Sequence, residues 1–316
     1  MIHIIVNPAG AAGRTVKFFR RSVLPLFSGA DYTIHFSSRT QGISEIVSKL
    51  TDPSVIPEGS FVNLAVVGGD GTMNEVLNGI RDFEHTRVGL IPAGSGNDLA
   101  RDLSLPPELE DIVARIRLEQ TFRQIDVGET VFLDRDYTMR FVTGSGFGFD
   151  AHVCHLVETA PLKSILNRLR IGKLVYLIEA IRLIFLWKNV PVTVTYGPRG
   201  DEGEHTRRMD RFMFLAAMNH RFEGGGFMIS PNASDTDGKL DICTVYNVSK
   251  LKFLQVFPKA LKGKHIQHKE CVSMARRTWV RVQCDTPQWV HCDGEPKYDS
   301  QDVRMQIADV KLNLMV

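Results

Sequence analysis

Residues 62–79 read VNLAVVGGDGTMNEVLNG, an apolar run followed by three glycines within four positions and then a helix-length segment. Glycines let the backbone turn sharply and bring N–H groups close to an anion. Asp70 can meet a hydrated Mg²⁺, and Thr72 can cap the helix that follows. The stretch is typical of a strand, a phosphate-binding turn and a helix, although an ordinary strand-to-helix turn has the same pattern.

A second glycine-containing loop, PAGSGNDLAR, occupies residues 92–101 and follows the strand-like run at residues 88–91. Two loops of this composition at the ends of successive strands favour a nucleotide phosphate site over a simple turn. The pattern GxxxxGK[ST] of P-loop enzymes is absent from the sequence, so the predicted site belongs to another class.

The first 121 residues alternate apolar runs with helix-length amphipathic segments. Strands are expected at residues 2–6, 32–36, 62–67 and 88–91, and helices at residues 15–27, 41–50 and 72–80. Such alternation predicts βαβ units and a mostly parallel sheet, in which ligands bind beyond the carboxyl ends of the strands. One nucleotide would then touch four loops, at the following residues: Asn7, Thr40, Asp70 and Ser95.

From about residue 122 the pattern changes to short stretches rich in Val, Thr and aromatic residues. Strands are expected at residues 138–143, 190–196, 211–218, 240–246, 278–284 and 288–292, with two helices among them. We therefore expect a second, largely antiparallel β domain. Residues 303–316 again look strand-like.

Five motifs occur together along nearly the whole chain: Asn7-Pro8, GGDGTMNEVLNG at residues 68–79, GSGNDLAR at 94–101, GFGFDA at 146–151 and CDGEP at 292–296. In this combination they resemble the diacylglycerol kinase and sphingosine kinase-like lipid kinases, in particular the bacterial members. The resemblance implies an N-terminal α/β domain of the NAD kinase and diacylglycerol kinase type and a C-terminal antiparallel β-sandwich-like domain with helical insertions. The domains would be residues 1–121 with about 303–316, and residues 122–302.

The same resemblance implies that ATP binds the glycine loops of the first domain and that Asp70 organises Mg-ATP. The residues expected to contact the nucleotide are Asn7, Thr40, Gly68, Gly69, Asp70, Gly71, Thr72, Asn74, Glu75, Ser95 and Asn97.

A kinase that acts on an alcohol needs a carboxylate within reach of the hydroxyl. Residues Asp293-Gly294-Glu295 offer one, although by spacing alone the Asp-Gly pair favours a hairpin turn. The resemblance implies instead that this motif supplies the proton acceptor. We expect Glu295 to be the base, with Asp293 beside it and Asp70 as the third catalytic residue.

Residues 231–240, PNASDTDGKL, combine carboxylates with a glycine, a composition that suits a hard cation bound by oxygen atoms. Without context, a solvated turn is the more ordinary interpretation. The resemblance implies a structural Mg²⁺ held by Asp237 and by the main-chain carbonyls of Ser234 and Lys239. Asp235 is an additional carboxylate to which we assign no role.

Asp150 lies in the motif GFGFDA, and the resemblance implies that it is a supporting carboxylate. The histidines are scattered along the sequence. We interpret His3, His35 and His291, which lie on strand-like runs, as packing residues.

The chain has 316 residues, of which 43% are hydrophobic and 23% are charged, as is ordinary for a globular enzyme of two domains. Its net charge of +2 is too small to indicate nucleic-acid binding. Five cysteines, an odd number without C-x-x-C spacing, favour reduced thiols over disulfides or a zinc site. The first residues lack the features of a signal peptide, so we expect a cytoplasmic protein.

Residues 162–188 combine six cations with large apolar side chains and Trp187. The uncharged stretches are too short to span a bilayer, which needs about 20 residues. Such a helix can lie at an anionic membrane surface with Trp187 as an anchor, or pack on the β domain with its charges in solvent. The oligomeric state stays open, with a homodimer as one alternative.

Together these features predict an ATP-dependent lipid kinase that requires Mg²⁺ and contacts the membrane peripherally. It would transfer the γ-phosphoryl group to a hydroxyl of diacylglycerol or a similar lipid alcohol. The alternatives are an NAD kinase-like or other small-molecule kinase of the same superfamily, or a catalytically silent lipid-binding regulatory protein. The intact Asp70, Asp293 and Glu295 argue against the silent protein.

Overall fold

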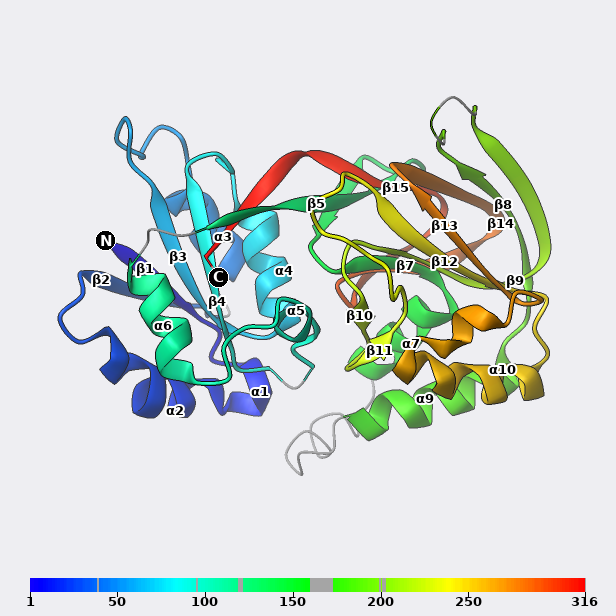
Figure 1. The fold of residues 1–316 in the computed structure, drawn as a ribbon, viewed down its shortest axis with the longest axis horizontal. Helices are drawn as coiled ribbons and strands as arrows, with labels where there is room; N and C mark the ends of the chain where they lie inside the picture. The colour runs from blue at the N-terminus through cyan, green and yellow to red at the C-terminus, as the bar shows by residue number, and fades with distance from the viewer. Residues whose placement is uncertain are drawn as a thin grey trace. The chain divides into compact units, whose positions relative to one another are not determined.

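The computed structural model describes residues 1–38, 40–94, 96–118, 122–159, 173–198, 200 and 203–315 and divides into two compact units (Figure 1). The first unit comprises residues 1–126 and 309–316, and the second comprises residues 127–308. Strand β5 (Arg123–Phe132) leaves the first unit, and the C-terminal strand β15 (Glu295–Met315) returns to it. The expected organisation into two domains is confirmed.

The first unit alternates strands with helical segments. In chain order its elements are β1 (Ile2–Val6), α1 (Gly10–Gly13), α2 (Thr15–Phe18), a π turn (Phe19–Val23), a 3-10 turn (Leu24–Phe27), β2 (Tyr32–Phe36), α3 (Ile43–Leu50), β3 (Val62–Gly68), α4 (Asp70–Gly79), β4 (Thr86–Pro92), α5 (Asp98–Asp102) and α6 (Leu109–Leu118).

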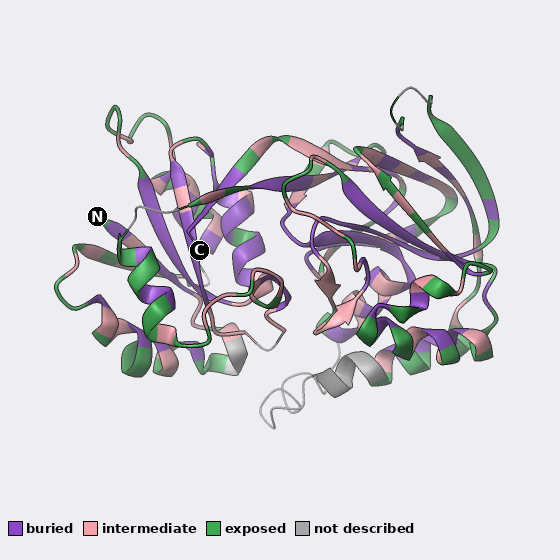
Figure 2. Cartoon of the chain, in the orientation of Figure 1, coloured by how far each residue is buried: buried purple, intermediate pink, exposed green. Residues whose placement is uncertain are grey.

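The strands of this unit pair side by side in the order β2, β1, β3, β4 and β15. β1 pairs in parallel with β2 and β3, β3 pairs in parallel with β4, and residues 313–315 of β15 pair in parallel with β4. β3 is buried along its whole length (Figure 2), as is typical of a strand covered on both faces. The loops that follow β3 and β4 therefore begin at the same edge of the sheet.

Helical segments bury their apolar side chains against these strands. Phe19, Phe27 and Ile116 join Ile4 and Ala65 in one core cluster, so residues 19–27 and α6 pack on the same face. The single helix expected at residues 15–27 is wrong in detail. The structure divides this segment into α2, a π turn and a 3-10 turn, and Pro25, which has no N–H to donate, stands at the start of the 3-10 turn.

The second unit is dominated by strands. In chain order its elements are β6 (Tyr137–Phe141), β7 (Gly144–Gly148), α7 (Phe149–Thr159), α9 (Lys173–Leu186), β8 (Val190–Tyr196), β9 (His205–Met218), β10 (Phe222–Glu223), β11 (Phe227–Met228), β12 (Leu240–Tyr246), α10 (Lys250–Val256), two 3-10 turns (Phe257–Lys262 and Lys264–Gln267), β13 (Val272–Arg277) and β14 (Trp279–Cys292).

The pairings within this unit are antiparallel, which confirms the expected β domain. β12 pairs with β13 and β9, β9 pairs with β7 and β8, and β14 pairs with β7, β8 and β15. The two strands expected at residues 278–284 and 288–292 are one strand, β14, with a register shift between Gln283 and Gln288. Residues 144–148, which include three glycines, form the buried strand β7.

Two apolar cores lie among the described residues of the second unit. One lies among the strands and includes Phe147, Phe212 and Val282. The other includes Phe149 of α7 and Leu183 of α9 and holds these helices against the sheet. In the described part of the chain, no helix combines the length and the apolarity that crossing a bilayer requires.

Candidate active site

The turn from β3 into α4 depends on glycine at residues 68 and 69. A Cβ on Gly68 would lie 2.4 Å from the Cβ of Thr72, so a larger residue would collide with the first turn of α4. A Cβ on Gly69 would lie 2.9 Å from the Cα of Gly94, and one on Gly94 would lie 2.6 Å from the Cα of Gly69. The loops after β3 and β4 thus approach each other backbone to backbone.

Asp70 joins the two loops through its carboxylate. Its two oxygens accept the backbone N–H groups of Asp98 and Leu99, at 3.1 and 3.2 Å. Asn97 has a left-handed backbone (φ 52°), and its side chain bonds both the N–H and the carbonyl of Gly94 at 3.0 Å. Two predicted site residues, Asp70 and Asn97, therefore fix the shape of the second loop.

The other residues predicted to contact the nucleotide differ in solvent exposure. The amide of Asn7 donates to the hydroxyl of Thr72 at 3.4 Å, which joins the end of β1 to α4. Asn74 is buried and Glu75 is exposed, both on α4 after Gly71. Thr40 is exposed and lies within hydrogen-bond distance of Ser38, at 3.1 Å. Ser95 lies outside the described residues.

Asp98 and Arg101 belong to the second loop but were not among the predicted site residues. Asp98 is only 5% exposed, and its carboxylate forms an ion pair with Arg101, one turn further along the chain. Arg101 also donates to the carbonyl of Gly96 at 3.3 Å. The spacing of an aspartate and an arginine at i and i+3 was the available signal, and it indicates a pair that braces the second loop.

In the second unit, residues 293 and 294 form the two-residue turn between β14 and β15. Both have positive φ (52° for Asp293 and 79° for Gly294), and Cys292 pairs with Glu295 across the turn. This is the hairpin that the Asp-Gly pair favoured from spacing alone. Glu295 is exposed at the start of β15.

The carboxylate of Asp293 points back into the fold. One oxygen accepts the N–H groups of Thr143 and Gly144, at 2.7 and 3.2 Å, and the other accepts that of Val142 at 3.0 Å. The residue is 9% exposed. Asp293 thus binds the turn to the segment between β6 and β7 and positions Glu295 from within.

His291 is the third feature near this turn, and our interpretation of it as a packing residue was incomplete. The ring is 2% exposed, with Asp150 3.5 Å from Nε2 and Glu223 3.6 Å from Nδ1. Burial lowers the pKa of His291, but the charges of Glu223, Asp150 and Asp293 outweigh it and raise the pKa to about 9. Glu223 lies on the short strand β10, which gave no sequence signal.

The predicted metal loop holds one carboxylate against an arginine. Asp237 forms an ion pair with Arg276 and accepts the backbone N–H of Lys239 at 3.0 Å. Arg276 also lies 3.6 Å from Asp241, whose pKa burial raises to about 6. Among the residues that the structure describes, no cluster of three or more His, Cys, Asp or Glu side chains is arranged to hold a metal ion.

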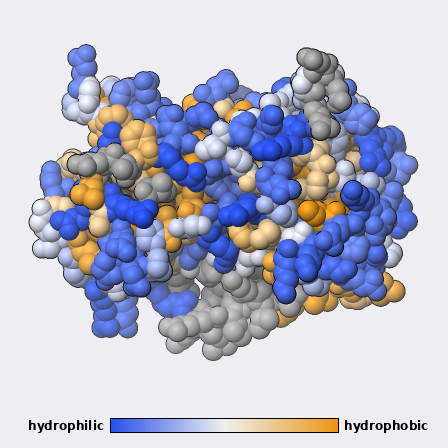
Figure 3. Space-filling model, in the orientation of Figure 1, coloured by the Kyte–Doolittle hydropathy of each residue, from blue (hydrophilic) through white to orange (hydrophobic). Residues whose placement is uncertain are grey.

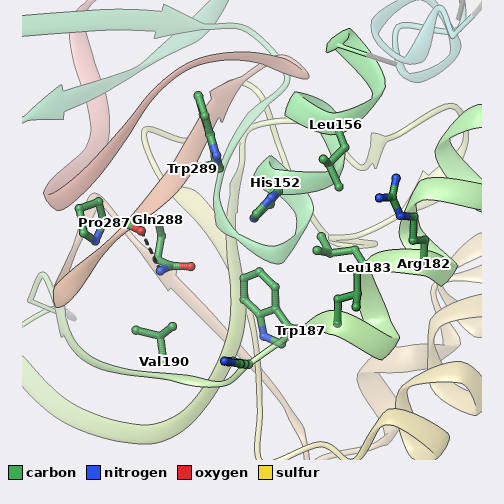
Figure 4. A pocket seen from close by; sticks show the side chains of 11 residues that line it. His152, Leu156, Arg182, Leu183, Trp187, Val190, Pro287, Gln288 and Trp289 are labelled. Carbon is green, nitrogen blue, oxygen red and sulfur yellow. Dashed lines mark hydrogen bonds between the residues drawn. The ribbon is translucent and has the colours of Figure 1, made fainter. Parts of the chain in front are cut away.

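A pocket of about 440 Å³ opens in the second unit between α7, α9 and β14 (Figure 4). Leu183, Trp187 and Trp289 contribute to its mostly apolar lining, and Arg182 and Lys188 add two cations. Trp187, the membrane anchor in one of the two alternatives for this segment, packs edge-on against the ring of Phe149, with centroids 5.4 Å apart. The neighbouring cations Arg168 and Arg170 lie outside the described residues.

Comparison with known proteins finds two matching family models. One, described as the diacylglycerol kinase catalytic domain, matches residues 1–130. The other, described as the YegS C-terminal NAD kinase beta sandwich-like domain, matches residues 145–316.

Named relatives agree with these matches. A diacylglycerol kinase of Mycobacterium tuberculosis (strain ATCC 25618 / H37Rv) is 31% identical over 233 residues, which are 73% of this chain and 69% of that protein. One of Bacillus subtilis (strain 168) is 26% identical over 236 residues, 74% of this chain and 71% of that protein. The crystal structure of a diacylglycerol kinase from Bacillus anthracis str. Sterne shares the fold, with a TM-score of 0.66 and 17% identity over 99% of this chain and 96% of that chain. This chain therefore belongs to the diacylglycerol kinase family of lipid kinases.

Proposed function

We propose that this chain is an ATP-dependent lipid kinase that transfers the γ-phosphoryl group to a hydroxyl of diacylglycerol or a similar lipid alcohol. The observation that carries the proposal is the pair of glycine loops that Asp70 joins at the edge of the parallel strands. Close backbone approach without side chains leaves room for phosphate oxygens, and N–H groups at such turns favour anions. Family membership supports phosphoryl transfer as the chemistry.

Within this proposal the roles of the acidic residues differ. Asp70 uses two lone pairs for main-chain N–H groups, and a carboxylate has about four, so it can still bind hydrated Mg²⁺ that accompanies ATP. Mg²⁺ would offset the negative charge of the phosphates. Glu295 is exposed and acts as the base for the acceptor hydroxyl. Asp293 is a positioning residue, since its oxygens hold three backbone N–H groups.

A radiolabelled-ATP assay over a panel of lipid alcohols, with NAD and sugars as competing acceptors, tests the proposal. We expect product only with lipid acceptors, and about 10²- to 10⁴-fold lower kcat in Glu295→Gln, because a general base contributes that much. Asp299→Asn, on the same strand and also exposed, is the matched control. Phosphorylation of NAD alone, or wild-type turnover by Glu295→Gln, would contradict the assignment.

We also propose that residues 231–240 bind a structural Mg²⁺ through Asp237 and the carbonyls of Ser234 and Lys239. The cation would compete with Arg276 for the Asp237 carboxylate. Because a ligand that binds only the folded state stabilises it, Mg²⁺ should raise the Tm of the wild type. Asp237→Asn should remove that increase, whereas Asp210→Asn, at an exposed carboxylate elsewhere in the unit, should keep it. An equal increase in both variants would reject the site.

Membrane contact is the third part of the proposal. We define the apolar face of the second unit as five exposed side chains on adjoining helices, with the following exposed fractions: Ile178 51%, Ile181 41%, Phe185 57%, Leu186 64% and Leu251 72%. Figure 3 shows hydrophobic residues along the lower right edge, where Figure 1 draws α9 and α10. Such a patch is unusual on a solvent-facing surface.

Charge around the apolar face favours an anionic bilayer as the partner. Lys250 donates to the main-chain carbonyl of Phe185, which ties α10 to α9, and Arg182 and Lys188 are exposed on or next to α9. Each cation near an anionic surface contributes about 1 kcal/mol. Apolar side chains and cations on one surface are the combination that interfacial helices use.

Vesicle sedimentation tests the apolar face. Replacing Ile181 and Phe185 together by Ser should weaken binding to phosphatidylglycerol vesicles by about tenfold or more, since a fully buried side chain of this size contributes about 1.5–3 kcal/mol. Leu133→Ser, at a side chain 46% exposed in the same unit, is the control and should bind normally. Equal sedimentation of all proteins would show that the face does not touch the bilayer.

A further inference from the structure

His291 is a buried ionisable side chain for which the proposed reaction has no direct use. It lies on β14, two residues before the turn that carries Glu295, and pairs with Gly146 of β7 and Pro296 of β15. The hydroxyl of Ser145 donates to its main-chain carbonyl at 2.7 Å. Its backbone is therefore fixed on both sides, and the ring has a defined direction.

Carboxylates from two other elements face the ring. Asp150, in the first turn of α7, lies 3.5 Å from Nε2, and Glu223 of β10 lies 3.6 Å from Nδ1. Gly146 makes this arrangement fit, because a Cβ there would lie 2.2 Å from Asp150 Oδ2 and 2.3 Å from His291 Nε2. Gly146, the first glycine of GFGFDA, therefore leaves the space that the Asp150 carboxylate and the His291 ring occupy.

The same ring contacts the turn itself. The N–H of Gly294 points at Nδ1, with the two nitrogens 3.2 Å apart. A neutral ring can accept this N–H at Nδ1, whereas a charged ring carries a proton there and donates towards Glu223. A charged ring therefore links α7 to β10, whereas a neutral ring links α7 to the turn through the N–H of Gly294.

We propose that His291 is the positioning residue for Glu295, holding the turn in place through Asp150 and Glu223. The inference rests on the proposed function, in which Glu295 is the base. Two carboxylates, Asp150 and Glu223, face the ring, and the charge of Asp293 also acts on it, so an imidazolium balances part of their charge. When the ring loses its proton, the carboxylates repel one another and Nδ1 accepts the N–H of Gly294 instead of donating to Glu223, so the turn before Glu295 shifts.

The charge state supports this role at neutral pH. Because the nearby carboxylates raise the pKa of His291 to about 9 despite its burial, the ring is charged below that pH. We therefore expect the kcat of the wild type to fall as the pH rises through about 9. A side chain that cannot titrate should abolish this change.

The test is His291→Gln, with His265→Gln as the matched control. His265 is also buried in the second unit, at 4% exposure, but its Nε2 lies 3.0 Å from the carbonyl of Ile229 rather than near a carboxylate. His291→Gln should lower kcat at neutral pH by about 10- to 100-fold, as a small displacement of a reacting group does, and leave the KM for ATP unchanged. The fall of kcat near pH 9 should disappear in this variant and persist in His265→Gln.

Hydrogen exchange separates this inference from the proposed function. Peptides that cover residues 291–297 should exchange faster in His291→Gln than in His265→Gln at the same pH. Faster exchange in a protein without kinase turnover would reject the function and keep the structural role of His291 in the turn. A kcat and a pH profile like those of the wild type, in an active His291→Gln enzyme, would overturn the inference and leave the function standing.

Discussion

Replacing Asp293 by Asn tests the role of Asp293 in the turn separately from the role of Glu295, which follows the turn. Asn tolerates the left-handed backbone that Asp293 adopts (φ 52°), so the substitution changes the hydrogen bonds without straining the chain. The amide oxygen can keep the N–H groups of Thr143 and Gly144. The amide nitrogen would then face the N–H of Val142, donor against donor, in a site only 9% exposed.

The expected loss follows from these contacts. Hydrogen bonds to a charged acceptor contribute about 1.5–3 kcal/mol each, and a buried donor left without an acceptor costs about 1–3 kcal/mol. One bond is lost and two become neutral, so we expect Asp293→Asn to lower the free energy of unfolding by about 2–4 kcal/mol. At about 2–4 °C per kcal/mol for a unit of this size, its Tm should fall by about 5–15 °C.

Calorimetry and kinase turnover, measured on the same preparations, check this prediction. Glu295→Gln should lose turnover but keep its stability. Its free energy of unfolding should change by no more than about 0.5 kcal/mol, as is usual at an exposed position. A Tm of Asp293→Asn equal to that of the wild type would refute the assignment of its carboxylate to the backbone.

Three further predictions concern other parts of the fold. Gly94→Ala should raise the KM for ATP at least severalfold, because its Cβ would lie 2.6 Å from the Cα of Gly69. Gly42→Ala is the control and should keep the KM of the wild type, because a Cβ at Gly42 would have no atom within 4 Å. Equal KM values in the two variants would contradict the close approach of the loops. The pKa of His291 is raised from 6.5 to about 9 in the folded state, so its contribution of about 3 kcal/mol is present below pH 6.5 and lost as the pH rises through 9. Denaturant titrations at neutral and alkaline pH should show this loss in the wild type and not in His291→Gln. Burial raises the pKa of the Cys292 thiol to about 12, so a thiol reagent should modify it only after unfolding, as mass spectrometry can determine.

Hydrophobic pattern and glycine spacing predicted the strands of the first unit and the loops that follow β3 and β4. The reason is physical, since a fully buried strand such as β3 needs a mostly apolar run, and the turn after it needs glycine. The same reasoning does not predict the strand at residues 144–148. They contain three glycines and one serine, a composition that pattern analysis assigns to turns, yet β7 pairs with β9 and β14 on its two sides.

Long-range contacts were beyond sequence reasoning. The partners of Asp293 lie about 150 positions earlier in the chain, so spacing around the Asp-Gly pair could indicate the turn and not the destination of the carboxylate. Likewise, Glu223 reaches His291 from a strand of two residues, too short to produce any period. Asp293 was interpreted by the charge of its carboxylate, whereas in the fold this carboxylate accepts hydrogen bonds from the backbone.

Asp70 and Asp293 have a similar structural role in their two motifs. Asp70 was expected to organise Mg-ATP and Asp293 to lie beside the catalytic base, and the two oxygens of each carboxylate accept backbone N–H groups of a neighbouring loop. An acidic side chain is well suited to this task, because one carboxylate can hold two or three N–H groups whose loop would otherwise have several conformations. Glu295 differs from both, since it is exposed at the start of a strand and its turn is held by Asp293. A carboxylate that builds the site and one that acts in it can therefore be distinguished by measuring stability and turnover in the same variant.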